Sequence, residues 1–154
     1  MSVLKTIAIY LLAVLVGTVL VSLANTHIDL QALAGIGARI PLAVRIDAVG
    51  RDLTGFGPTL LVLITIGFAI AFPVAGWISR WLGAGWRHFG FALAGAVAVI
   101  VMVSSITLFY QVALEATITP VASSRELAGL LTLSLGGLIA GLLFATLKPA
   151  AHAT

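Results

Sequence analysis

Residues 127–147 read LAGLLTLSLGGLIAGLLFATL, an unbroken apolar stretch without a charged side chain. A helix needs roughly 20 apolar residues to cross a hydrocarbon core about 30 Å thick. Three more runs of this kind lie upstream, at residues 7–23, 60–78 and 89–110. Together the four runs occupy more than half of the 154 residues. We therefore predict an all-α integral membrane protein with four transmembrane helices.

The composition agrees with this class. The chain has 61% hydrophobic and only 8% charged residues, and its mean hydropathy is +1.21. The length leaves room for a single membrane domain, residues 1–154, without a separate soluble domain. We expect the spans at about residues 6–24, 58–78, 89–111 and 127–147. Cysteine is absent, which excludes disulfides and thiolate metal sites.

The charged residues indicate the orientation of these spans. Lys5, Arg80, Arg87 and Lys148 fall on one side of the membrane, and all five acidic residues fall on the other. Both sides hold four basic residues, but the short connector with Arg80 and Arg87 contains no acid, and its charges lie close to the span ends. Such a connector is typical of the cytoplasmic side, so we predict that both termini are cytoplasmic. The run at 7–23 is longer than the apolar part of a usual signal peptide, which favours a retained span. A composition rich in Ala, Leu and Gly and poor in Lys suggests the inner membrane of a bacterium.

The outer connection between the first two spans, residues 25–57, is not polar enough to lie free in water. Apolar residues alternate along 40–47, as in a strand, but apolar residues between 42 and 53 also share one helical face. Pro41 at a first turn and Gly50 at an end favour the helix. We expect a short interfacial segment here, on the outer surface of the membrane.

The second and fourth spans begin alike. Residues 51–55 read RDLTG and residues 125–129 read RELAG, which suggests a weak internal repeat of two hairpins. The alternative is that each pair only places an acid in the first turn of a helix, near the positive end of its dipole. We group the charged residues on this side as the outer charge cluster: Arg45, Asp47, Arg51, Asp52, Arg125 and Glu126.

The sequence offers no catalytic, cofactor or metal site. The expected spans contain hydroxyl groups but no His, Lys or carboxylate that could activate them, so we do not expect an enzyme. His27 and His88 lie at opposite ends of their spans and cannot bind the same haem iron. No basic stripe favours nucleic acid.

The clearest positive signal is a set of small residues at helix-packing spacing in spans 3 and 4. They are Gly90, Ala94, Ala98, Gly129, Gly137, Gly141 and Ala145. Small residues let helix backbones approach closely, which drives helix association in lipid. The rows could pack the two spans together within one chain, or they could face another subunit.

A chain with little besides packing surface points to a non-enzymatic role. We expect an accessory or scaffold subunit of a larger membrane complex. The alternative is a small oligomeric transporter or channel for a solute. The expected partners are the lipid bilayer and either another membrane protein or further copies of this chain.

Overall fold

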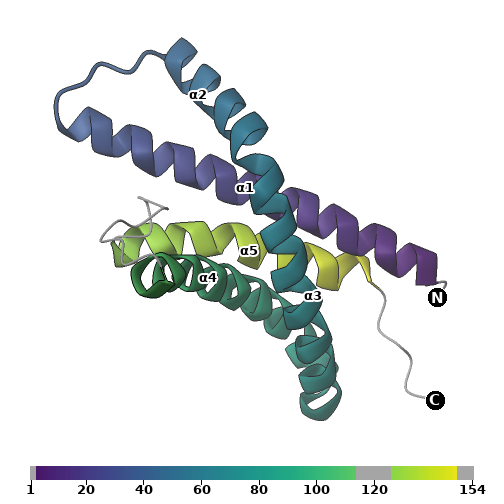
Figure 1. The fold of residues 1–154 in the computed structure, drawn as a ribbon. Helices are drawn as coiled ribbons and strands as arrows, with labels where there is room; N and C mark the ends of the chain where they lie inside the picture. Colours follow the sequence, from purple (N-terminus) through teal and green to yellow (C-terminus); the bar gives the residue numbers. More distant parts are fainter. Residues whose placement is uncertain (1–2, 114–125, 149–154) are drawn as a thin grey trace.

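The computed structural model describes residues 3–113 and 126–148, and these residues are helical throughout apart from short connections (Figure 1). The elements are α1 Val3–Gly35, α2 Leu42–Gly55, α3 Gly57–Leu82, the short 3-10 helix η1 Ala84–Trp86, α4 Arg87–Ala113 and α5 Leu127–Leu147. Four of them, α1, α3, α4 and α5, are long and apolar enough to cross a membrane. The prediction of an all-helical chain with four apolar helices of this length is confirmed.

Helix α1 continues well past residue 24, where we expected the first span to end. Its 33 residues would extend about 50 Å, more than the hydrocarbon core of a bilayer requires. The chain leaves the helix at Gly37, whose φ of 91° is a conformation that favours glycine. There the N–H of Gly37 donates to the carbonyl of Ala34 and the N–H of Ala38 donates to that of Leu33.

Helix α2 settles the choice between strand and helix in the outer connection. Pro41 caps its start, and its carbonyl accepts the N–H groups of Val44 and Arg45 at 3.0 and 3.2 Å. The predicted end at Gly50 is wrong, because the helix continues to Gly55. One interior glycine costs a helix only about 1 kcal/mol, and the Thr54 hydroxyl donates to the Gly50 carbonyl across this turn.

Helices α2 and α3 meet almost without a loop, at Phe56. The N–H of Phe56 donates to the carbonyl of Asp52, and the carbonyl of Phe56 accepts the N–H of Leu60. Figure 1 shows the consequence: α2 leads directly into α3, and α3 then runs steeply across α1 and α5. Helices α4 and α5, by contrast, lie side by side and share the most extensive contact in the fold.

An aromatic cluster fills the centre where α3 meets its neighbours. The Phe72 ring stacks on Phe68 and on Phe144, with 4.6 Å between ring centroids in both pairs. The Phe91 ring meets Phe72 edge-on at 5.8 Å. These four side chains, from α3, α4 and α5, are all buried. They fix the point at which the steep helix α3 crosses the α4–α5 pair.

Candidate functional site

The contact between α4 and α5 is a seam of glycines. A Cβ atom on Gly137 would overlap the carbonyl group of Gly95, and one on Gly141 would overlap that of Phe91. A Cβ on Gly95 would in turn overlap the carbonyl of Gly137. The two backbones therefore touch, and only glycine fits at these three positions. Backbones this close gain dispersion and weak Cα–H···O contacts in place of side-chain packing.

The seam includes one residue that the sequence pattern did not single out. Gly95 lies one position after Ala94, so it is outside the predicted row of Gly90, Ala94 and Ala98. Its neighbours Ala94 and Ala96 are also small, so the sequence alone does not show that Gly95 is the residue in contact with α5. The sequence feature that could have identified it is a glycine between two alanines inside a span.

The opposite side of α5 packs on α1. A Cβ on Gly136 would lie 2.8 Å from a methyl group of Val21, and one on Gly17 would lie 3.2 Å from the Cβ of Ala140. Helix α5 is therefore enclosed by α4 on one side and by α1 on the other. Gly129 and Ala145 are also buried, so all four small residues predicted on this helix are covered within the chain.

The small row of α4 faces α3 rather than α5. A Cβ on Gly90 would lie 3.3 Å from the hydroxyl of Ser79 and from the ring of Trp86. The Cβ of Ala98 lies 3.8 Å from where a Cβ of Gly67 would be. Ala94 is half-buried near the same helix. The predicted packing residues thus divide between two interfaces.

Beside this contact, α3 and α4 enclose a long apolar groove of about 900 Å³, which we call the α3–α4 groove. It runs from Trp86 and Gly90 at one end to Phe109 and Tyr110 at the other. Half-buried small residues lie along its lining, and exposed aliphatic side chains project beside them: Gly67, Ala71, Ala94 and Ala98, with Ile66, Ile70, Val97 and Val101.

Near the start of α3, the side chain of Asp52 links α2 to α1. Its carboxylate accepts hydrogen bonds from the hydroxyl groups of Ser22 at 2.5 Å and Thr26 at 3.1 Å. Both hydroxyl residues are buried. Between these two residues on α1, the Asn25 amide donates to Asp29, one turn further along, at 3.3 Å. This cluster was not predicted, since the sequence pattern paired Asp52 with arginines.

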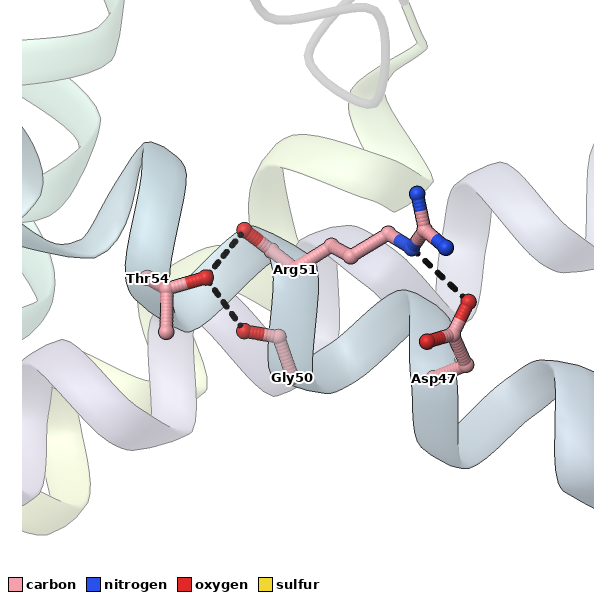
Figure 2. Close-up of polar contacts among 4 residues, drawn as sticks. All are labelled: Asp47, Gly50, Arg51 and Thr54. Carbon is pink, nitrogen blue, oxygen red and sulfur yellow. Dashed lines mark hydrogen bonds and ion pairs between the residues drawn. The ribbon is translucent and has the colours of Figure 1, made fainter.

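The outer charge cluster is divided in the structure. Arg51 Nε donates to the Asp47 carboxylate at 2.8 Å along α2 (Figure 2), with the side chains 80% and 62% exposed. Exposed pairs of this kind contribute about 0–1 kcal/mol. Arg45 donates instead to the carbonyl of Ile40 at 3.5 Å. Glu126 is exposed at the start of α5, and Arg125 lies outside the described residues.

The potential metal ligands of the described chain lie apart from one another. Within residues 3–113 and 126–148, no three His, Asp or Glu side chains lie together so that they could hold a metal ion. His27 is exposed, and its Nε2 lies 2.8 Å from the Nε2 of its helical neighbour Gln31, at hydrogen-bond distance. No protein-family model, curated protein or solved structure matches this chain. The surfaces of the chain are therefore the basis for proposing its function.

Proposed function

We propose that this chain is a non-enzymatic accessory subunit of a larger membrane complex, and that its α3–α4 groove receives one transmembrane helix of the partner protein. The observation that carries the proposal is the groove itself, which is large, almost wholly apolar and lined by small side chains. In lipid, helices associate where small residues let backbones approach.

The length of the groove suits a helix. About 20 residues of α4 separate Gly90 from Tyr110, which corresponds to roughly 30 Å of helix and to the thickness of the hydrocarbon core. The aliphatic side chains beside it provide contact area. Ile70 is 66% exposed and Val101 is 56% exposed, so both are available to an incoming side chain.

The orientation that we propose places both termini in the bacterial cytoplasm, with α2 at the outer surface of the inner membrane. It is supported by the distribution of charge over the helices. Arg80, Arg87 and Lys148 lie at one end of the spans, and Asp47 and Asp52 lie on α2 at the other. Basic residues near span ends favour the cytoplasmic side.

A matched pair of tryptophan variants tests the partner proposal. Val97 is 45% exposed in the groove, and Val19 is 41% exposed on α1, outside it. Val97→Trp fills the groove, so after mild detergent extraction we expect the native mass to fall from that of a complex to that of the chain alone. Val19→Trp adds the same ring elsewhere and should leave the complex intact.

Three results would contradict the proposal. The first is that the wild-type chain is extracted only as a monomer. The second is that both variants retain the partner equally. The third is that the wild-type chain forms a stable homo-oligomer that moves a solute across liposomes without a partner chain. That last result would favour the alternative, a small oligomeric transporter or channel.

A further inference from the structure

A second pocket, distinct from the α3–α4 groove, lies at the opposite side of α3. It has a volume of about 470 Å³ and is lined by α1, α3 and α5, together with Lys148 just past the end of α5. We call it the inner-end pocket. Its inner part is aromatic, with Tyr10, Phe72 and Phe144, whereas Arg80 and Lys148 also belong to its lining.

Pro73 lies inside α3 and lines the pocket together with Ala69. Because proline has no N–H, the Ala69 carbonyl has no helical donor from residue 73. Both residues are exposed, so this stretch of α3 is open to a ligand in the pocket.

The charged part of the pocket lacks a counterion from the described part of the chain. Burial lowers the pKa of the Lys148 ammonium, and the positive charges of Arg87 and Arg80 lower it further. Every described carboxylate lies on α2, on the outer part of α1 or at the start of α5. Arg80 and Lys148 both line the pocket, and Arg87 donates to the Ala145 carbonyl at 2.8 Å, near the end of α5. An anion between Arg80 and Lys148 would relieve the repulsion between them.

The shape and the charge together select an amphiphile. A free inorganic anion would leave the aromatic part of the pocket unfilled, and an uncharged lipid would leave the cations uncompensated. Trp77 also lines the pocket and is 60% exposed. Indole rings favour the headgroup region of a bilayer, so Trp77 places the cations at the depth of lipid phosphates.

We propose that the inner-end pocket binds one anionic phospholipid, with its phosphate between Arg80 and Lys148 and an acyl chain along the exposed lining residues Ile7 and Pro73. Basic pockets between helices are suited to such headgroups. This site is independent of the α3–α4 groove, so it does not rest on the presence of a protein partner.

The test compares lipids that remain bound to the purified full chain. The protein is extracted, mixed with equal amounts of phosphatidylglycerol and phosphatidylcholine, and analysed by native mass spectrometry. We expect one phosphatidylglycerol to be retained in preference. Each basic residue near an anionic lipid contributes about fivefold in affinity. Lys148→Gln should lower the preference about fivefold, and a second substitution, Arg80→Gln, should lower it further.

Two controls separate the pocket from general charge effects. Arg51→Gln removes the same charge from the exposed face of α2 and should leave the preference unchanged. Lys148→Arg keeps the charge and should retain it. If the double variant does not fold, the single variant Lys148→Gln provides the test. Lys148 follows the last residue of α5, so replacing it does not alter the interior of the helix.

The proposal is overturned if phosphatidylcholine is retained as well as phosphatidylglycerol, or if Lys148→Gln keeps the wild-type preference. It is also overturned if inorganic phosphate at equal concentration displaces the lipid and stabilises the protein as much. That outcome would assign the cations to a free anion.

Discussion

Asp52 and Asp47 are five residues apart on α2, but their carboxylates have different surroundings. Asp52 turns toward α1 and accepts the buried hydroxyl groups of Ser22 and Thr26. Asp47 turns outward and pairs with exposed Arg51 (Figure 2). A carboxylate that accepts from a buried donor contributes more to stability than one in an exposed ion pair, because removing it leaves the Ser22 hydroxyl buried without that acceptor.

We expect Asp52→Ala to destabilise the fold by about 1–3 kcal/mol, through loss of the acceptor for the buried Ser22 hydroxyl. The Thr26 hydroxyl keeps the Ser22 carbonyl as an acceptor, at 3.1 Å. Asp47→Ala should change stability by less than about 0.5–1 kcal/mol. Denaturant unfolding in detergent micelles measures both changes, and protease cleavage of α2 would report its release from α1. Equal effects of the two variants would show that the hydrogen bonds of Asp52 do not anchor α2.

Residue partners were harder to predict than residue types. The sequence indicates that Ser22 is a span hydroxyl and that Asp52 is an outer charge. It does not indicate that the two meet, because this depends on α1 continuing beyond the first apolar run and on α2 folding back beside it. The direction of each side chain is set by that tertiary arrangement.

At the scale of helices, the seam between α4 and α5 is the tightest contact. Backbone atoms occupy the space where a Cβ of Gly137 would lie, so a methyl group there must push the helices apart. Backbone cannot yield as a flexible side chain does. The seam therefore tolerates no larger residue without displacement of a whole helix.

We expect Gly137→Ala to lower the free energy of unfolding by about 1–3 kcal/mol, because of overpacking. Gly50→Ala is the matched control. Gly50 lies inside α2, and a Cβ added there would meet no other atom within 4 Å, so alanine should stabilise the helix by about 0.5–1 kcal/mol. Thermal unfolding in micelles measures both. A wild-type midpoint for Gly137→Ala would mean that the seam is looser than described.

Helices were predictable where hydrophobicity alone decides, and less so elsewhere. The four apolar runs indicate the long helices, because no other structure satisfies the backbone in lipid. The extension of α1 to Gly35 and of α2 through Gly50 was not predicted, since polar residues there resemble a loop. The sequence also did not predict which helix packs against each glycine, because α4 and α5 carry small residues on several faces.

At the scale of the whole molecule, the helices separate the charges into two groups. Among the described residues, basic residues without acids lie near the junction of α3 and α4 and at the end of α5, whereas Asp47 and Asp52 lie on α2 together with Arg45 and Arg51. Both proposals depend on this arrangement relative to a bilayer. The α3–α4 groove must lie within the hydrocarbon core, and the inner-end pocket must lie at the level of a headgroup layer.

We propose that the chain crosses the inner membrane with α2 outside and the α3–α4 junction inside. Because the chain has no cysteine, single cysteines report on one position each. Ala43 on α2 and Gly85 in η1 are both exposed, so either can react once reagent reaches it.

The direct measurement is labelling of Ala43→Cys and Gly85→Cys in intact cells with a thiol reagent that does not cross the inner membrane. We expect Ala43→Cys to be labelled in intact cells and Gly85→Cys to be labelled only after lysis. Labelling of Gly85→Cys in intact cells, with Ala43→Cys protected until lysis, would contradict it.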